Sequence, residues 1–335
     1  MTAPRTRIGV IGVGAVAQIA PLPALAARDD VVLVGVCDSD RAKARALATR
    51  FGVRDVFEDI EDLLAYARPD AVVIATPNHL HEIHVRTALS ARVAVLCERP
   101  IALSTGGVER VLEAQRRAER PVLVGLNHRY RSDVQAARAF VHGKELGPLR
   151  GIRGGWYQFR PSRAELGWRL RAAEAGGGAL LDLGLPLLDL GLWLAEGAKP
   201  VQATAVLHKT GDGVEDAGCA LVVCEDGYAI FVDVAWHYVG DHERFWLDVL
   251  GERGSARVSP LSVFKEMHGT PVNVTPTGAA SRENLISASY RAEWATFLAA
   301  IRDEVPPPAL DDQLLLHRTM DAIYRSAREG RAVPV

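Results

Sequence analysis

The sequence has few cysteines, no excess of charge of one sign and no long apolar run, and each absence excludes a class of protein. Its four cysteines show no CxxC spacing, which predicts reduced thiols in a cytoplasm. Basic and acidic residues nearly balance at 39 and 41, so bulk charge predicts no nucleic-acid partner. No uninterrupted apolar run reaches the roughly 18 residues that span a bilayer, and the N-terminus lacks the apolar stretch of a signal peptide, so no membrane partner is expected.

The composition is typical of a globular protein. With 335 residues, the chain is long enough for about two domains of roughly 150 residues each. In the first third, short apolar runs alternate with stretches of helical spacing, which predicts parallel strands joined by helices. Pro21 and Pro23 predict a kinked or shortened first helix. The expected strands are residues 7–12, 31–37, 71–75, 93–97 and 122–126, and the expected helices include 41–51, 81–88 and 105–119.

After about residue 126 the pattern changes to that of an antiparallel sheet with a few helices. Tight turns are expected at residues 225–227 and 251–254, where glycine and acidic residues cluster between apolar runs. The expected strands are residues 201–209, 217–224, 228–238, 244–250 and 255–258. The expected helices are residues 178–194, 290–303 and 311–329, the last of them ended by Gly330.

A glycine-rich turn follows the first expected strand, where residues 12–17 (GVGAVA) match the pattern G-x-G-x-x-A. The first glycine permits a tight turn, the second lets a pyrophosphate approach the backbone, and the small third residue lets helix and strand pack closely. Asp38 ends the next strand, where a carboxylate accepts hydrogen bonds from an adenosine ribose and repels a 2′-phosphate. The alternative for Asp38 is a helix cap. The sequence therefore predicts NAD rather than NADP, held by Gly12, Gly14, Ala15, Val16 and Asp38.

Further motifs resemble those of the Gfo/Idh/MocA family of oxidoreductases, in the right order and over nearly the whole chain. They are residues 75–81 (ATPNHLH), 97–100 (CERP), 127–130 (NHRY), 168–169 (WR), 176–184 (GGGALLDLG) and 322–327 (AIYRSA). The resemblance implies a fold class of α/β Rossmann domain plus an α+β domain built on a large, mostly antiparallel sheet. Residues 1–126 would bind NAD, and residues 127–335 would form the substrate and oligomerisation domain, with a last helix able to pack back on the Rossmann domain. The cofactor contacts it implies are Thr76, Pro77, Asn78, His81, Glu98, Arg99, Asn127, Trp168 and Arg169.

Two positions depart from the family pattern. Family members usually carry Glu-Lys-Pro and Asp-x-Gly-x-His, and the resemblance implies that this lysine and histidine handle the proton of the substrate hydroxyl. Here those positions are Arg99 and Pro186. Arginine stays protonated and cannot act as a base, although it can bind a carboxylate or stabilise an alkoxide. We therefore predict Asp182 and Arg99 as the catalytic residues, with proton transfer left to Asp182, to a histidine or tyrosine of the second domain, or to water.

Three functions follow from these motifs. The first is an NAD-dependent oxidoreductase acting on a sugar, polyol or related cyclic alcohol, with atypical proton-transfer residues. The second is a non-catalytic NAD-binding regulator or sensor, and the third is a redox-neutral glycosidase that uses NAD. A sheet covered by few helices leaves one face bare, which predicts a homodimer or homotetramer assembled through that face.

Two groups of side chains have competing interpretations. His79, His81 and His84 lie close together, but no acidic or cysteine partner completes a zinc spacing, so no metal is expected. The aromatic residues of the second domain either line a sugar-binding surface or pack within the sheet, and they are Trp156, Tyr157, Phe159 and Trp168.

Overall fold

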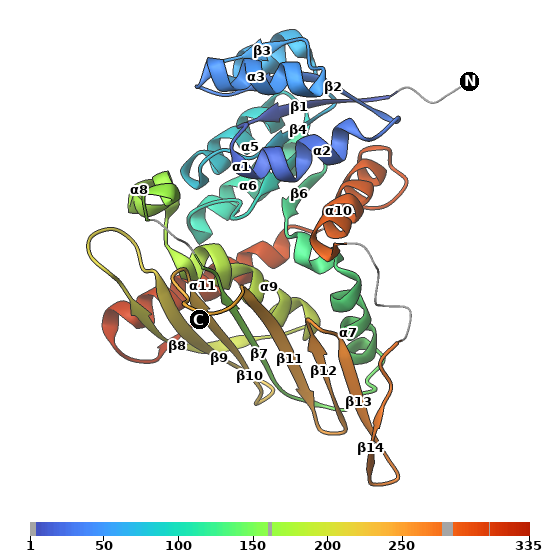
Figure 1. Cartoon of the computed structure of the whole chain (residues 1–335), viewed down its shortest axis with the longest axis vertical. Coiled ribbons are helices and arrows are strands. Elements are labelled where there is room, and N and C mark those ends of the chain that lie inside the picture. The colour runs from blue at the N-terminus through green and yellow to red at the C-terminus, as the bar shows by residue number, and fades with distance from the viewer. Residues whose placement is uncertain (1–4, 160–162, 277–283, 308) are drawn as a thin grey trace. The chain divides into compact units, whose positions relative to one another are not determined.

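Two sheets organise the chain, each in its own unit (Figure 1). The computed structural model describes residues 5–159, 163–276, 284–307 and 309–335. The first unit comprises Met1–Asn127 and Ser287–Leu314, and the second comprises His128–Ile286 and Leu315–Val335.

The first unit contains a six-stranded sheet in the order β3-β2-β1-β4-β5-β6, with every pair parallel. Its strands are β1 (Thr6–Ile11), β2 (Val31–Cys37), β3 (Val56–Phe57), β4 (Ala71–Ile74), β5 (Ala94–Glu98) and β6 (Val122–Gly125). Side chains such as Ile8, Val73 and Val95 are fully buried, as expected for strands covered on both faces. The predicted Rossmann sheet is confirmed.

The helices of this unit follow from local sequence signals. They are α1 (Ala15–Ile19), α2 (Pro21–Ala26), α3 (Arg41–Phe51), α4 (Ile60–Asp62), α5 (His81–Ser90) and α6 (Thr105–Ala118). The break between α1 and α2 falls just before Pro21, because proline cannot continue the hydrogen-bonding of the preceding turn. Asp40 caps α3 by accepting from the Lys43 N–H, and Gly52 ends it with φ +68°. The predicted shortened first helix is therefore confirmed.

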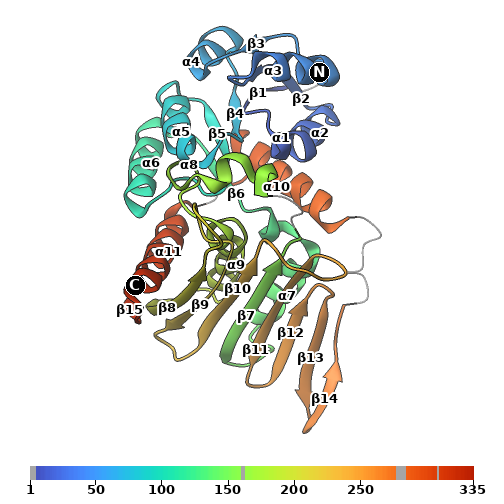
Figure 2. The same cartoon turned by 60° about the vertical axis from the view of Figure 1, so that its left-hand side comes forward.

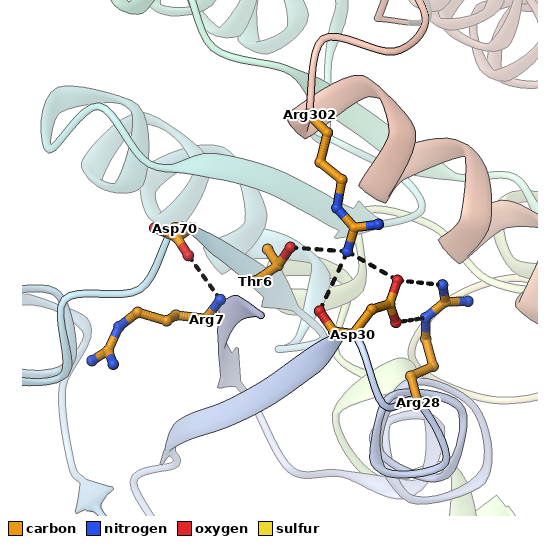
Figure 3. A network of polar contacts seen from close by, with 6 residues as sticks. All are labelled: Thr6, Arg7, Arg28, Asp30, Asp70 and Arg302. Atoms are coloured by element: carbon orange, nitrogen blue, oxygen red, sulfur yellow. Dashed lines mark hydrogen bonds and ion pairs between the residues drawn. The ribbon is translucent and has the colours of Figure 1, made fainter. Parts of the chain in front are cut away.

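Helix α10 (Leu285–Ile301) completes the first unit, although it follows the second sheet in the sequence. Trp294, Phe297 and Leu298 pack into the same buried cluster as Ile8 and Val73. At the end of α10, the Arg302 guanidinium donates to the Asp30 carboxylate at 2.9 Å and to the Thr6 hydroxyl at 3.2 Å, as Figure 3 shows. Arg28 holds the same carboxylate at 2.8 Å, and the two arginines lower the pKa of Asp30. An apolar core and an ionic network thus both attach α10 to this unit.

The second unit contains a nine-stranded sheet in the order β14-β13-β12-β11-β7-β10-β9-β8-β15 (Figure 2). Neighbouring strands are antiparallel except β7 and β10, which are parallel. The strands are β7 (Leu149–Tyr157), β8 (Pro200–His208), β9 (Ala217–Cys224), β10 (Ala229–Ala235), β11 (Arg244–Gly251), β12 (Gly254–Val258), β13 (Ser262–Met267), β14 (Thr270–Asn273) and β15 (Val333–Pro334). The predicted large, mostly antiparallel sheet is confirmed.

Helices cover one face of this sheet. They include α7 (Ser132–His142), α9 (Leu185–Leu194) and α11 (Asp311–Glu329), which belongs to this unit from Leu315 onward, with the short α8 (Ala172–Ala175) before α9. Helix α9 packs on β7 and β10, and α7 packs on β12. The stretch Ala172–Leu194 is long and apolar enough to cross a bilayer by length and composition, but 83 % of its most apolar 18 residues are buried inside the protein. It therefore fits a core helix of this unit.

Sequence patterning missed β7, the β13–β14 hairpin and α7. Strand β7 pairs with both β10 and β11, yet its glycines and arginines hide any alternation of apolar residues. The glycines are required by close packing: a Cβ on Gly155 would lie 2.6 Å from the Trp246 indole nitrogen, and one on Gly154 would lie 2.9 Å from Leu247. The sequence did not predict this strand, because side chains of the neighbouring strand β11 fill the space beside its glycines.

Candidate functional site

The two glycines of the turn after β1, Gly12 and Gly14, differ in backbone conformation and in the space around them. Gly12 has φ +84°, and a Cβ there would lie 2.7 Å from the backbone of Ala75 and Thr76. Gly14 has φ −69°, an ordinary value for any residue, and a Cβ there would meet no heavy atom within 4 Å. The fold itself therefore requires glycine at position 12 but not at position 14. The open space beside Gly14, at the turn after β1, would admit a dinucleotide pyrophosphate.

The Asp38 carboxylate lies against this turn. One oxygen accepts from the Val13 N–H at 2.9 Å and pairs with the Lys43 ammonium at 2.9 Å, and the other accepts from the Asp40 N–H at 2.9 Å. Asp40, and not Asp38, caps α3. A carboxylate at the end of β2 beside the glycine turn matches the ribose-binding acid of dinucleotide folds. The residues present therefore fit NAD.

The segment after β4 continues the same edge of the sheet. Thr76, Pro77 and Asn78 lead through a 3₁₀ turn (Asn78–Leu80) into α5, which begins at His81. The buried His81 ring places Nδ1 at 2.6 Å from the Pro100 carbonyl and Nε2 at 2.8 Å from the Thr76 carbonyl. A neutral imidazole donates through only one nitrogen, and burial lowers the pKa of His81. His81 thus joins the loops after β4 and β5.

Another histidine of this stretch contacts the loop after β4. His84 Nδ1 lies 3.2 Å from the Thr76 hydroxyl, within hydrogen-bond distance. Throughout the part of the chain that the structure describes, no three His, Cys, Asp or Glu side chains are grouped to hold a metal ion.

Buried acids gather where β5 and α10 meet within the first unit. Glu98, the last residue of β5, is buried, and this burial raises its pKa, with Arg99 partly opposing the rise. Burial and the nearby Glu98 raise the pKa of Glu293 on α10 well above its usual value. Two buried atoms in this region, Glu293 Oε1 and Arg99 Nε, have no hydrogen-bond partner among the described residues. The Asn127 amide donates to the Ser289 hydroxyl at 3.0 Å.

Glu293 was missed in the sequence. The available signal was an acid next to Trp294 on a helix whose apolar side chains include Phe297 and Leu298. An acid that must be buried with such a helix carries a desolvation cost, which marks it for attention.

The remaining predicted residues belong to the second unit. Asp182 lies in a π-helical turn (Leu180–Gly184) directly before α9, and its carboxylate accepts from the Trp236 indole N–H at 2.9 Å. Pro186 lies in the first turn of α9 and is buried. The Arg169 guanidinium lies 4.8 Å from the centre of the Trp168 ring. The second unit thus carries Asp182, Trp168 and Arg169, and the first unit carries the other predicted residues.

The aromatic side chains of β7 have partners within the sheet. Trp156 packs edge-to-face against His128 and Phe245, with ring centres 5.1 and 5.5 Å away, and its indole donates to Glu243 at 2.6 Å. The Tyr157 hydroxyl donates to the Asp233 carboxylate at 2.6 Å. Phe159 is 60 % exposed. Packing against Phe245 of β11 and against His128 accounts for Trp156, while Phe159, beyond the end of β7, has no comparable burial.

Comparison with known proteins agrees with this geometry. Residues 6–126 match the model of an oxidoreductase family with an NAD-binding Rossmann fold, and residues 134–257 match the GFO/IDH/MocA C-terminal domain. The fold and the matched regions define an oxidoreductase-type protein with an NAD-binding domain. The chain belongs to the Gfo/Idh/MocA family.

Individual relatives cover nearly the whole chain. The D-glucoside 3-dehydrogenase of Escherichia coli (strain K12) is 30 % identical over 99 % of this chain and 98 % of its own length. An uncharacterised oxidoreductase of Rhizobium meliloti is 28 % identical over 97 % of each chain. Among solved structures, GenD2 from gentamicin A biosynthesis in complex with NAD aligns with a TM-score of 0.87 at 27 % identity, covering 99 % of this chain and 97 % of its own.

Proposed function

We propose that this chain is an NAD-dependent dehydrogenase that oxidises a hydroxyl group of a sugar, a polyol or a related cyclic alcohol. The observation that carries the proposal is the space beside Gly14 next to the Asp38 carboxylate, since the fold has no use of its own for glycine there. The class of substrate is supported by the names of relatives, which include a D-glucoside 3-dehydrogenase, a D-apiose dehydrogenase and an inositol 2-dehydrogenase.

The first unit supplies the cofactor contacts of this proposal. The backbone of residues 12–16 receives the pyrophosphate, and the Asp38 carboxylate accepts from the ribose hydroxyls. A 2′-phosphate would meet the negative charge of Asp38, which favours NAD over NADP. The remaining contacts proposed in this unit are Thr76, Pro77, Asn78, His81, Glu98, Arg99 and Asn127. Trp168 and Arg169 are the contacts proposed from the second unit. When bound, NAD supplies the hydride acceptor.

The second unit supplies the proton chemistry. As the C–H bond of the substrate breaks and its electron pair leaves as hydride, the Asp182 carboxylate takes the hydroxyl proton and the C=O bond forms. Pro186 has no titratable group and is buried in α9, so it takes no part in proton transfer. Arg99 keeps its proton and orients the substrate or stabilises the developing alkoxide.

Turnover with the purified chain tests the proposal. NAD⁺ or NADP⁺ is mixed with a panel of sugars, sugar acids and polyols, and the absorbance of reduced nicotinamide is followed. We expect reduction with NAD⁺ and a loss of about 100-fold or more in kcat for Asp182→Asn. Asp226→Asn, on an exposed turn of the same unit, is the matched control and should be unchanged. An Asp182→Asn variant with full kcat would contradict the assigned role.

A second candidate, a regulator that binds NAD without catalysis, is favoured by one observation: neither Arg99 nor Pro186 can transfer a proton. The double substitution Arg99→Lys with Pro186→His separates the candidates. A regulator gains turnover only in the double variant, whereas a dehydrogenase is active without it. Cleavage of a nitrophenyl glycoside without net reduction would instead indicate a redox-neutral glycosidase.

We also propose that the uncovered face of the nine-stranded sheet mediates a homodimer or homotetramer. On this face Val206 is 69 % exposed and Leu221 is 38 % exposed, whereas their neighbours Ala205 and Ala220 point to the covered face. Light scattering should give at least twice the chain mass of 36.2 kDa, and Leu221→Arg should lower it. A monomeric wild-type chain would refute this assembly.

A further inference from the structure

The helical segment that carries Asp182 begins without a cap of its own. The first N–H groups of a helix have no partner within the helix and need acceptors from elsewhere. Here the segment is preceded by Gly176, Gly177 and Gly178, which have no side-chain oxygen, and no side chain at its start forms a capping bond. The acceptors must come from another part of the chain.

Glu215 supplies these acceptors. Its carboxylate oxygen Oε1 accepts from the Gly178 N–H at 2.7 Å and from the Leu180 N–H at 3.1 Å. Its own backbone carbonyl accepts from the Ala179 N–H at 2.8 Å. A single buried residue therefore binds the amides of positions 178, 179 and 180, immediately before Asp182. Carboxylates at this end of a helix are also favoured by the helix dipole.

Tyr324 on α11 holds the Glu215 carboxylate in place. Its hydroxyl donates to Oε1 at 2.8 Å. Burial and the charge of Glu215 raise the pKa of Tyr324 well above its usual value, so this phenol stays protonated and remains a donor. The oxygen Oε1 thus receives three hydrogen bonds and has one fixed position.

The glycines before the segment are matched to this arrangement. A Cβ on Gly178 would lie 1.8 Å from the Glu215 carbonyl oxygen, and one on Gly177 would lie 2.1 Å from the Tyr324 hydroxyl oxygen. Any side chain at either position would push Glu215 or Tyr324 away. These glycines serve the packing around Glu215.

A second anchor reaches the Asp182 side chain itself. The Asp216 carbonyl accepts from the Trp236 N–H at 2.8 Å, which fixes the backbone of this tryptophan beside the Glu215 segment. The Trp236 indole, 1 % exposed, then donates to Asp182 Oδ2 at 2.9 Å. Residues 215 and 216 therefore contact the backbone before Asp182 directly and, through Trp236, one oxygen of its carboxylate.

We propose that Glu215 and Trp236 are positioning residues for Asp182: Glu215 fixes the turn that carries it, and Trp236 fixes the orientation of its carboxylate. The catalytic part of this inference rests on the proposed function, in which Asp182 accepts the hydroxyl proton. A displacement of about 1 Å in such a group can cost a factor of about 100 in rate.

Four variants test Glu215. Glu215→Ala removes the acceptor and should lower kcat at least about 30-fold, with the dissociation constant for NADH unchanged. Glu215→Gln keeps an acceptor oxygen and should restore kcat to within about threefold of wild type, a rescue that loss of charge alone would not allow. Tyr324→Phe removes one bond to Oε1 and serves where Glu215→Ala does not fold. Glu225→Gln, on an exposed turn of the same sheet, is the matched control and should match wild type.

Amide hydrogen exchange provides a readout that needs no turnover. In Glu215→Ala, the amides of residues 178–182 should exchange at least about tenfold faster, while the amides of β9 and β10 keep wild-type rates. Glu215→Gln should restore slow exchange. Unchanged exchange at 178–182 in both Glu215→Ala and Tyr324→Phe would overturn the role of Glu215, whether or not the chain is active.

Trp236→Phe tests the second anchor. It keeps a buried ring but removes the donor, and we expect kcat to fall about tenfold with little change in KM, because a displaced carboxylate affects proton transfer more than substrate binding. A change in KM alone, or none in either constant, would overturn the role of Trp236. Asp182→Asn distinguishes failure of the proposed function from failure of this inference. If this variant retains full kcat, the proposed catalytic role of Asp182 is wrong. The exchange result still decides whether Glu215 fixes the turn.

Discussion

The two glycine-rich segments of this protein contain glycine for opposite structural reasons. Next to Gly14, in the first unit, the protein leaves the space of a side chain empty. At Gly177 and Gly178, in the second unit, the protein fills that space with Tyr324 and Glu215. The same residue type therefore leaves room for the proposed ligand in one unit and allows close internal packing in the other, and the atoms around each missing Cβ distinguish the two cases.

Buried glutamates show a parallel difference. Glu215 in the second unit is bound by two backbone amides and a tyrosine hydroxyl. Glu293 in the first unit has a buried oxygen without a partner among the described residues. Each contrast can be tested by changing one member and leaving the other intact.

The largest effect is expected at Gly178. Gly178→Ala would bring Cβ to 1.8 Å from a backbone oxygen, which cannot move as a flexible side chain can. We expect a loss of about 3 kcal/mol or more in the unfolding free energy, together with loss of turnover. Gly197→Ala in the same unit is the control: it also has a positive φ, +79°, but no atom within 4 Å, so it should cost only about 1 kcal/mol. Equal melting temperatures for the two variants would refute the packing explanation.

The next effect concerns Glu293 and depends on pH. Because burial raises its pKa in the folded state, the folded chain binds more protons than the unfolded chain above the ordinary pKa of about 4.3. The unfolding free energy therefore falls as pH rises from that value toward the folded pKa. Glu293→Gln removes this dependence, so its stability relative to wild type should increase with pH between pH 5 and pH 8, by at most about 1.4 kcal/mol per pH unit.

Urea unfolding over that pH range measures this difference. Glu304→Gln, at an exposed position beyond the end of α10, should follow wild type at every pH. Parallel pH profiles for wild type and Glu293→Gln would show that the carboxyl ionises as freely in the folded chain as in the unfolded one.

The sequence was sufficient to predict the elements whose own residues carry a local pattern. Strand β2, helix α3 and helix α11 lie at the predicted bounds, because apolar periodicity, the Gly52 ending and the Gly330 ending are local signals. It was insufficient for β7, where partners such as Trp246 occupy the space above glycines. Long-range packing of that kind leaves no local pattern.

The candidate site divides in the same way. Asp38 and the glycine turn could be found because their spacing along the chain is fixed by the strand–turn–helix unit. Glu215 and Trp236 could not, because Glu215 lies 33 positions and Trp236 lies 54 positions after Asp182 in the sequence, and only the fold brings them together. The spacing of residues along the chain carries no sign of these contacts.

The smallest effect on stability is expected at Gly14, the counterpart of Gly178 in the first unit. At φ −69° an alanine is not strained, and its methyl group meets no protein atom, so Gly14→Ala should leave the fold intact or stabilise it by about 0.5 kcal/mol through the unfolded state. The same methyl group lies where the pyrophosphate is proposed to bind, so NADH should bind about tenfold more weakly, which corresponds to about 1.4 kcal/mol. Stability and affinity then change in opposite directions, whereas Gly178→Ala lowers stability and turnover together. Thermal unfolding without cofactor, and fluorescence titration with NADH, measure the two quantities separately. If Gly14→Ala bound NADH as tightly as wild type, the space beside Gly14 would not be the pyrophosphate site, and the strongest structural argument for a dinucleotide enzyme would be lost.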